Sequence, residues 1–333
     1  MLYAIGPIML FASCQNDPLL LDTSTEVPYD MSFPEMEYPQ DNPYSEEGWL
    51  LGKHLFFDTR LSKDGTKSCA SCHAPELAFS DKTAISLGVF DRPGNRNSPP
   101  LFNIGYHPYF TREGGVPTLE MQVLVPIQEK HEFNTNIVDL AAILQQDSLY
   151  NRLSKEAYGQ EFGHFVLTRA LATFERGLIS KNSKFDQFAA GNTQALNKEE
   201  IDGMKLFYSK RTNCFACHSG FNFTDYSFAN NGLYETYSDP GRMRLTGEAS
   251  DNAMFKVPSL RNVAVTGPYM HDGSITTLEG VIAHYSSGVK AHTNKSDLVQ
   301  ILNLDEAEKK ALIAFLECLT DYQFLTNPRF KKN

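Results

Sequence analysis

Apolar residues recur in this chain at the spacing of an α-helix. Ile201, Met204 and Phe207 fall on one helical face. Asn197 and Glu200 precede them at the spacing of a capping box, in which each residue caps the backbone of the other. The pattern therefore predicts a helix that begins after Asn197 and leads toward a pair of cysteines.

A second capping box introduces a helix near the end of the chain. Asp305 and Glu308 have the same spacing and precede another apolar stripe. The residues that we expect to face the core are Ala311, Leu312, Phe315, Leu316 and Leu319. Cys318 lies beside this stripe, and we interpret it as a small buried hydrophobic residue.

Weaker helical patterns occur in both halves of the chain. They cover residues 45–57, 118–130, 137–148, 162–180 and 277–287. Alternation of apolar and polar residues is scarce, so we predict a mainly α-helical fold. The polar stretch 180–196 is the predicted seam between two domains, at 45–182 and 183–333. A segment rich in Pro, Asp and Tyr over 15–44 predicts an extended arm before them.

The charge balance excludes one class of partner. The 333 residues carry a formal net charge of −10, whereas nucleic-acid binding needs clustered Lys and Arg. An acidic surface would instead attract cationic partners. The sequence does not settle the oligomeric state, and a homodimer is an open alternative.

The N-terminus predicts export. Residues 2–13 form an apolar run that is too short for a membrane span but suits the core of a signal peptide. Cys14 follows Ala12 and Ser13 in the manner of a bacterial lipoprotein processing site. We therefore expect a signal peptide over 1–14 and a periplasmic protein anchored through a lipid on Cys14. An ordinary signal peptide with an incidental cysteine is the alternative.

Four of the six cysteines fall in two motifs with chemistry of their own. Cys69 and Cys72 precede His73, and Cys214 and Cys217 precede His218, so both segments match C-x-x-C-H. This is the attachment motif of c-type haem, in which two thiols bind the porphyrin and the histidine ligates iron. Chance would produce about 0.003 such matches in a chain of this composition. Two accidental matches are excluded, and the sequence predicts two covalent haems.

Two other interpretations compete with a haem enzyme. A zinc site would require the cysteine pairs to cooperate on one metal, yet they lie 145 residues apart and each has its own histidine. A pure electron carrier would need both irons ligated on both faces, whereas an enzyme leaves one face open and sets acid–base groups above it.

With these motifs, the sequence resembles the bacterial di-haem cytochrome c peroxidase family, which includes the MauG-like enzymes, over roughly residues 45–328. The matching elements are GKHLFFD at 52–58, SCASCH at 68–73, GNRNSPPLFN at 94–103, LEMQVLVPI at 119–127, HEFN at 131–134, NCFACH at 213–218, VPSLRNVAVTGPYMHDGS at 257–274 and TLEGVIAHYSSG at 277–288. The resemblance implies two cytochrome c-like domains, with the peroxidatic haem in the first and the electron-accepting haem in the second.

The resemblance also assigns residues to the open face of the first haem. Glu132 matches the family glutamate that moves a proton during cleavage of the peroxide bond, and Gln122 matches the glutamine that orients the peroxide. Many family peroxidases cap this iron with a loop histidine, but no histidine lies between Ala74 and Tyr106. We therefore expect this iron to be open. His107 and His131 remain alternative ligands.

The second haem departs from the usual methionine ligation. Tyr285 stands at the matching position, as in MauG-like enzymes, and a phenolate ligand would lower the reduction potential. Met254 or Met270 as the ligand, with Tyr285 in the core, is the alternative.

The segment that the resemblance places between the haems also departs from the family pattern. The family tryptophan is replaced in the segment 108–115, and the only tryptophan is Trp49. Tyr109 and Phe110 are candidates to line the electron path, while Thr111 and Arg112 occupy the region where the indole is expected.

The resemblance implies one structural calcium ion. Its ligands would be the Asn97 side chain and the backbone carbonyls of Thr266 and Pro268.

These expectations favour a peroxidase that reduces hydrogen peroxide with electrons from a small cytochrome or another small redox protein. A MauG-like oxidase that acts on residues of a partner protein is the first alternative, and a pure electron carrier is the second.

Overall fold

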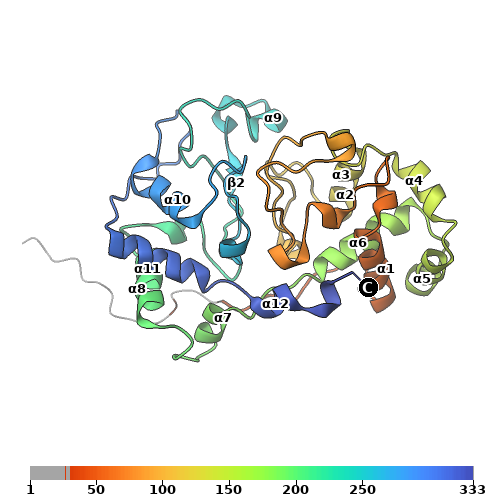
Figure 1. The fold of residues 1–333 in the computed structure, drawn as a ribbon, viewed down its shortest axis with the longest axis horizontal. Coiled ribbons are helices and arrows are strands. Elements are labelled where there is room, and N and C mark those ends of the chain that lie inside the picture. Colours follow the sequence, from red (N-terminus) through yellow and green to blue (C-terminus); the bar gives the residue numbers. More distant parts are fainter. Residues whose placement is uncertain (1–26, 28–30, 333) are drawn as a thin grey trace, which may run out of the picture.

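The computed structural model of the chain describes residue 27 and residues 31–332, and it forms two mainly helical lobes that lie side by side (Figure 1). The helices of the first lobe are α1 (Glu46–Phe56), α2 (Leu119–Gln122), α3 (Leu124–Gln128), α4 (Ile137–Leu144), α5 (Ser148–Tyr158) and α6 (His164–Arg176). Those of the second are α7 (Lys184–Ala189), α8 (Lys198–Phe207), α9 (Met243–Thr246), α10 (Leu278–Ala283) and α11 (Glu306–Glu317). The predicted helical fold is confirmed.

Strand structure is limited to one short pair in the described residues. Strands β1 (Phe228–Ala229) and β2 (Phe255–Lys256) are antiparallel, with Phe228 opposite Lys256. Both strands belong to the second lobe, and β2 faces the first lobe in Figure 1.

Each lobe is organised around one close helix crossing. In the first lobe α1 crosses α6, and a Cβ at Gly52 would collide with the backbone of Ala170. In the second lobe α8 crosses α11, and a Cβ at Gly203 would collide with the backbone of Ala311. A glycine at each crossing therefore lets the two backbones approach and bury the apolar faces around them.

Both predicted capping boxes are confirmed. Asn197 Oδ1 accepts from the Glu200 amide at 3.0 Å, and Glu200 Oε2 accepts from the Asn197 amide at 2.7 Å. Asp305 and Glu308 make the same reciprocal pair at 2.9 and 3.0 Å. Each cap is worth about 0.5–2 kcal/mol of helix stability. The stripe that we predicted for the last long helix is buried, and Cys318 is buried beside it.

The two lobes repeat one local construction. Asn103 and Asn262 both have left-handed backbones and begin a short 3-10 turn. The Asn103 amide donates to the Leu178 carbonyl, and the Asn103 side chain accepts from the Ser180 amide at 2.8 Å. In the second lobe Asn262 makes the matching pair of bonds with Leu319 and Asp321. Each asparagine thus fixes the chain where it leaves the last long helix of its lobe.

Several helix boundaries differ from the sequence pattern. The predicted helix over 118–130 is interrupted at Val123, which separates α2 from α3. Helix α5 was not predicted, because its apolar residues are few and its sequence is strongly polar. Helix α7 lies within the predicted seam 180–196, since Phe185 and Phe188 bury in the core of the second lobe.

The ends of the described chain tie the lobes together. After α11, helix α12 (Tyr322–Thr326) returns along the lower side of Figure 1, and Phe324 and Phe330 pack in the core of the first lobe. From the arm, Phe33 packs on Tyr106 and Phe221, with ring centroids 5.9 and 4.8 Å away. Residues 1–14, including Cys14, lie outside the described residues.

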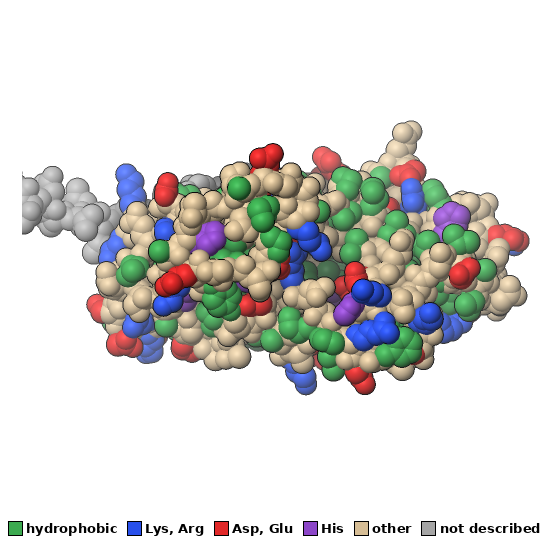
Figure 2. Space-filling model, turned by 90° about the horizontal axis from the view of Figure 1, so that it is seen from above, with side chains coloured by type: hydrophobic (Ala, Val, Ile, Leu, Met, Phe, Trp, Pro, Cys, Tyr) green, Lys and Arg blue, Asp and Glu red, His purple; other side chains and the backbone are tan. Residues whose placement is uncertain are grey.

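The surface carries both signs of charge. Figure 2 shows acidic and basic side chains interspersed over the face that is seen from above. Among the helices of residues 27 and 31–332, none is both long enough and apolar enough to cross a membrane.

Candidate haem sites and peroxide-facing residues

Both cysteine pairs have the same local backbone. Cys69 and Cys214 each begin a 3-10 turn, and in each turn the histidine amide donates to the carbonyl of the first cysteine at 3.0 Å. The four thiols form no disulfide. Such a turn presents both thiols and the histidine from one short loop, which is what covalent haem attachment requires.

The two motif histidines are held in one tautomer. His73 Nδ1 lies 2.9 Å from the Phe79 carbonyl, and His218 Nδ1 lies 3.2 Å from the carbonyls of Phe223 and Pro258. A carbonyl only accepts, so Nδ1 carries the proton and Nε2 keeps its lone pair. Burial lowers the pKa of both imidazoles, which keeps them neutral. Neutral histidines fixed by a second bond are suited to ligate iron.

A shared metal site for the two motifs is not supported. Within residues 27 and 31–332, no group of three or more His, Cys, Asp or Glu side chains is placed to hold a metal ion. The cysteine pairs belong to different lobes, so they do not form the zinc site that we weighed against haem.

Glu132 lies in the loop between α3 and α4. Its amide donates to the Glu129 carbonyl, and its carbonyl accepts from the Val89 amide, both at 2.9 Å. Its charge acts on the thiols of Cys69 and Cys72, which places the carboxyl near the first motif. Although the side chain is accessible to solvent, desolvation by the surrounding protein and the nearby Glu129 raise the pKa of Glu132 to about 7.

A carboxyl with this pKa exchanges its proton readily near neutral pH. That property matches a group that must both take and return a proton during one reaction.

Gln122 ends helix α2, which begins at the cap of Thr118. Its Oε1 is buried and lacks a hydrogen-bond partner among the described residues. Leaving such an atom unpaired costs about 1–3 kcal/mol. This amide oxygen is therefore available to accept a hydrogen bond, which is what the residue expected to orient peroxide requires.

Tyr285 lies in a π-helical turn, His284–Gly288, that follows α10. Turns of this kind occur frequently at functional sites. Burial raises the pKa of Tyr285 to about 12, and the Cys214 and Cys217 thiols act on it as well. The structure therefore brings this phenol close to the second motif.

The alternative methionine ligands lie in different surroundings. Met270 Sδ accepts from Asn231 Nδ2 at 3.2 Å, and Asn231 also forms a side-chain hydrogen bond with Tyr285. Because its sulfur already accepts a hydrogen bond, Met270 is a weaker candidate than Tyr285. Met254 pairs with Gly241 in an isolated bridge. Asn231 was not recognised from the sequence.

Each alternative cap of the first iron has its Nδ1 in a contact, while His107 Nε2 is buried without a hydrogen-bond partner among the described residues. His107 Nδ1 lies 3.2 Å from Lys256 Nζ, and the His107 ring packs on Tyr226 at 5.0 Å. Burial and the Lys256 charge hold the pKa of His107 well below its usual range. His131 Nδ1 lies 2.9 Å from the Pro93 carbonyl.

Trp49 and the two residues predicted to line the electron path, Tyr109 and Phe110, lie in three different parts of the structure. Trp49 is buried on α1 in the core of the first lobe. Tyr109 stacks on Phe228 of the second lobe, with centroids 5.2 Å apart, whereas Phe110 is buried within the first lobe. Of the two residues predicted to line the electron path, Tyr109 is therefore the one that contacts the second lobe.

The predicted calcium ligands do not fit an ion as they are arranged. Asn97 Oδ1 accepts from Arg112 Nη2 at 2.9 Å, so the oxygen that would bind calcium already contacts a cation. The Asn97 amide donates to the His271 carbonyl at 2.9 Å, which places Asn97 beside the loop containing Thr266 and Pro268.

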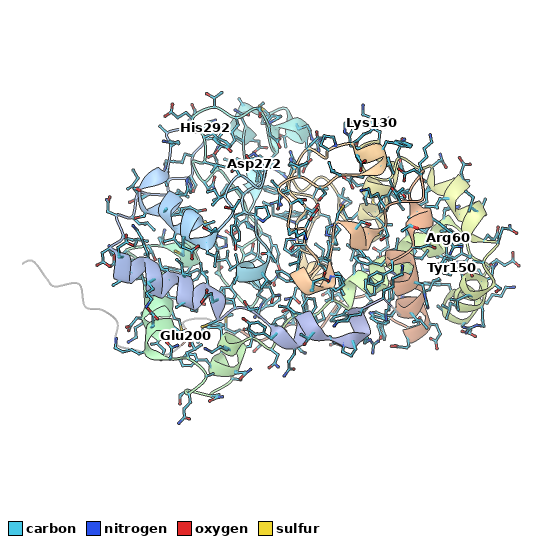
Figure 3. The ribbon with its side chains drawn as sticks, in the orientation of Figure 1. Arg60, Lys130, Tyr150, Glu200, Asp272 and His292 are labelled. Carbon is cyan, nitrogen blue, oxygen red and sulfur yellow. The ribbon has the colours of Figure 1, made fainter. Side chains whose placement is uncertain are left out.

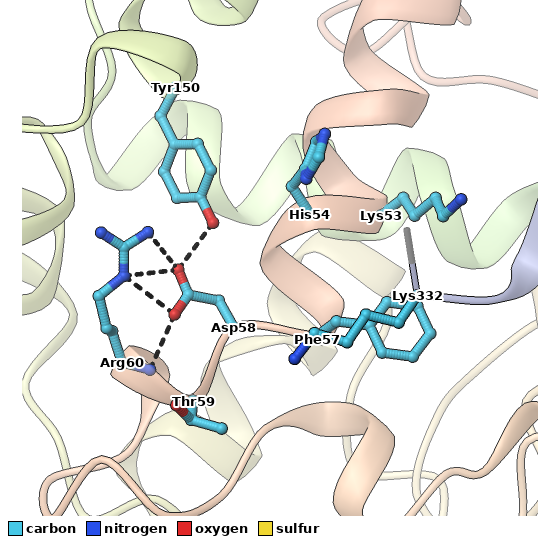
Figure 4. Close-up of a pocket in the computed structure, with 8 residues that line it drawn as sticks. All are labelled: Lys53, His54, Phe57, Asp58, Thr59, Arg60, Tyr150 and Lys332. Carbon is cyan, nitrogen blue, oxygen red and sulfur yellow. Dashed lines mark hydrogen bonds and ion pairs between the residues drawn. The ribbon is translucent and has the colours of Figure 1, made fainter.

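A pocket on the first lobe lies away from this region. It is lined by Lys53, His54, Phe57, Asp58, Thr59, Arg60, Tyr150 and Lys332 (Figure 4). Arg60 and Tyr150 both bind the Asp58 carboxylate, each at 2.7 Å. Figure 3 shows Lys130, two residues before Glu132, at the top of the lobe and Arg60 and Tyr150 at its outer side. The pocket contains none of the predicted site residues.

Similarity to known proteins agrees with this arrangement. The model of the family described as di-haem cytochrome c peroxidase matches residues 46–194. The methylamine utilization protein MauG of Methylophilus methylotrophus is 37% identical over 283 residues and 84% of each chain. Cytochrome c551 peroxidase of Nitrosomonas europaea is 34% identical over 286 residues, covering 84% of this chain and 81% of its own.

A solved structure shows the same architecture. The crystal structure of a MauG-like protein associated with microbial copper homeostasis is similar with a TM-score of 0.85 and 33% identity, covering 91% of this chain and 99% of that chain. The two helical lobes thus have the fold of the MauG-like di-haem proteins. The chain belongs to the di-haem cytochrome c peroxidase family, which confirms the family predicted from its motifs.

Proposed function

We propose that the protein reduces hydrogen peroxide to two waters at a haem bound by Cys69, Cys72 and His73, with Glu132 as its acid–base group. The observation that carries this proposal is the raised pKa of Glu132, to about 7, beside the first cysteine pair. A surface glutamate of an electron carrier would have no reason for such an environment.

Glu132 and Gln122 have different roles in the proposed reaction. Reduction of one peroxide consumes two electrons and two protons and yields two waters, and the bound haem iron supplies the redox chemistry. The Glu132 carboxylate takes the proton from the oxygen near the iron and returns it to the departing oxygen. Gln122, whose amide oxygen is unpaired among the described residues, would accept a hydrogen bond from the peroxide and orient it.

The second motif supports electron entry. Cys214, Cys217, His218 and Tyr285 would hold a haem whose chemistry is electron transfer. This haem would take electrons from a small cytochrome or another small redox protein and pass them to the first lobe.

A MauG-like oxidation of a partner protein is the second candidate function. The observation that favours it is the position of Tyr285, whose phenol lies near the second motif where a methionine would serve in many peroxidases. In that case both haems would store oxidising equivalents, and the electrons would come from residues of the partner.

The proposal includes the setting of the enzyme. Residues 1–14 would act as a signal peptide, and a lipid on Cys14 would anchor a periplasmic protein to the membrane. Covalent c-type haem is attached after export, which agrees with this location.

Haem content and donor preference test the proposal. A pyridine haemochrome assay should find two covalent haems per chain. Purified protein should then consume peroxide with a reduced small cytochrome or a small dye as donor. Failure to turn over with such donors, together with peroxide-dependent oxidation of a partner protein, would favour the second candidate. A protein with one haem or none would contradict both.

A further inference from the structure

Arg112 makes an unusual set of contacts within the first lobe, at its border with the second. Its Nε and Nη2 donate to the backbone carbonyl of Asn97 at 3.0 and 2.9 Å, and Nη2 also donates to Asn97 Oδ1. The Asn97 side-chain Nδ2 donates to the Thr83 carbonyl at 3.3 Å, which fixes Oδ1 toward the guanidinium. Asn97 therefore offers both of its oxygens to one side chain.

The same arginine is attached to the second lobe through its backbone. The Arg112 carbonyl accepts from the Lys256 amide at 2.7 Å, and Lys256 belongs to β2. Asn97 in turn donates its amide to His271 of the second lobe. The Arg112–Asn97 pair thus lies where both lobes meet.

Charged residues next to Arg112 form ion pairs that join the first lobe to the second. Glu113 is buried and binds Arg96 of the first lobe and Arg244 of the second. Arg96 also binds Asp239 of the second lobe, with its Nε and Nη2 at 2.6 and 2.8 Å from the carboxylate. The two carboxylates of this network, Glu113 and Asp239, balance the charges of Arg96 and Arg244 beside Arg112.

A calcium ion and this guanidinium exclude each other. Calcium would require Asn97 Oδ1 at about 2.3–2.6 Å. Arg112 Nη2 already lies 2.9 Å from that oxygen, so a divalent ion there would contact a second cation at close range. A guanidinium group stays protonated at neutral pH, so Arg112 carries a full positive charge beside Asn97.

We propose that the Arg112 guanidinium takes the place of the interdomain calcium and that this protein holds its lobes together without a metal ion. The inference concerns the joint between the lobes, and it holds whether the enzyme acts on peroxide alone or on a partner protein.

Metal analysis of the di-haem protein tests the inference directly. After dialysis against EGTA and then against metal-free buffer, elemental analysis should find calcium far below one atom per chain. The melting temperature and the Soret and EPR spectra should be the same before and after chelation. One calcium per chain, or a spectral or thermal change that added calcium reverses, would overturn the inference. These measurements need no turnover.

Variants of Arg112 give the complementary test. Arg112→Ala should lower the melting temperature more than Arg92→Ala does, because Arg92 is exposed and outside the network. Added CaCl₂ should raise the melting temperature of Arg112→Ala but not that of the wild type, with MgCl₂ as the control salt. Equal melting temperatures for the two alanine variants, or an equal calcium effect on wild type and Arg112→Ala, would contradict the assignment. Should Arg112→Ala fail to fold, Arg112→Gln, which removes the charge but keeps most of the side-chain length, takes its place in the comparison.

Discussion

The Glu132 amide donates a hydrogen bond to the Glu129 carbonyl at 2.9 Å, and this turn keeps the two carboxyl groups close enough for the charge of Glu129 to raise the pKa of Glu132. The pKa of Glu132, the proposed catalytic carboxyl, therefore depends on desolvation by the surrounding protein and on the charge of Glu129, which takes no part in the reaction itself.

Replacing Glu132 with Gln should remove the proton carrier without altering haem attachment. We expect kcat for peroxide reduction to fall by about 10²–10⁴-fold, because glutamine can accept a hydrogen bond but cannot carry the proton. Steady-state turnover with a saturating reduced donor measures the effect. Glu76→Gln, which changes an exposed glutamate of the same lobe, is the matched control. Turnover of Glu132→Gln within twofold of this control would remove Glu132 from its role.

The pH dependence of kcat/KM should report the pKa of Glu132. The base form is needed to take the proton, so activity should rise as the pH increases through about 7 and should be lost below it. Glu129→Gln removes the repulsive charge, which lowers the pKa of Glu132 and shifts the rising limb to lower pH. Stopped-flow rates between pH 5.5 and 8.5 would show the shift. An unchanged limb in Glu129→Gln would assign the profile to another group.

Oxidised protein should bind peroxide without prior reduction. The loop between Ala74 and Tyr106 contains no histidine that could cap the first iron, which leaves His107 and His131 as the alternative ligands. We expect a high-spin ferric EPR signal from one haem and a rapid Soret change when peroxide is added to the fully oxidised protein. Low-spin signals from both haems, with reaction only after partial reduction, would show that another residue caps the first iron. A high-spin signal that appears in His107→Ala would identify that residue.

Ligation by Tyr285 should set the potential of the second haem. Tyr285→Met should raise this potential, because a thioether stabilises ferrous iron where a phenolate stabilises ferric iron, and Tyr285→Phe should open the site. Spectroelectrochemical titration measures both effects. Met270→Leu is the control, since it removes the competing sulfur near Asn231 and should leave the potential nearly unchanged. A large shift in Met270→Leu alone would make Met270 the ligand.

Features that depend on neighbouring residues were predictable from the sequence. The two capping boxes and the buried stripe of α11 involve residues three or four positions apart, and such spacing fixes their contacts. The haem motifs are equally local. For Glu132 and Gln122 the residues alone were not enough, because only the resemblance to a family marked them among other surface polar groups.

Contacts between segments that are far apart in the sequence could not be read from the pattern. The pairing of Arg112 with Asn97 and the position of Asn231 beside Tyr285 depend on how distant segments pack. One signal was nevertheless present in the chain. Leu-x-Asn occurs at 101–103 and 260–262, and Thr-Leu-Glu occurs at 118–120 and 277–279. This repeat corresponds to the matching asparagine turns at Asn103 and Asn262 in the two lobes.

The return of the C-terminal segment to the first lobe constrains when that lobe can finish folding. Phe79, whose carbonyl holds His73, packs against Phe324 and Phe330 with ring centroids 5.9 and 6.0 Å away. During synthesis these two rings emerge after the second lobe, so the packing behind His73 stays incomplete until that whole lobe has been made. A chain that is cut short before residue 320 would therefore carry its defect in the lobe that was made first.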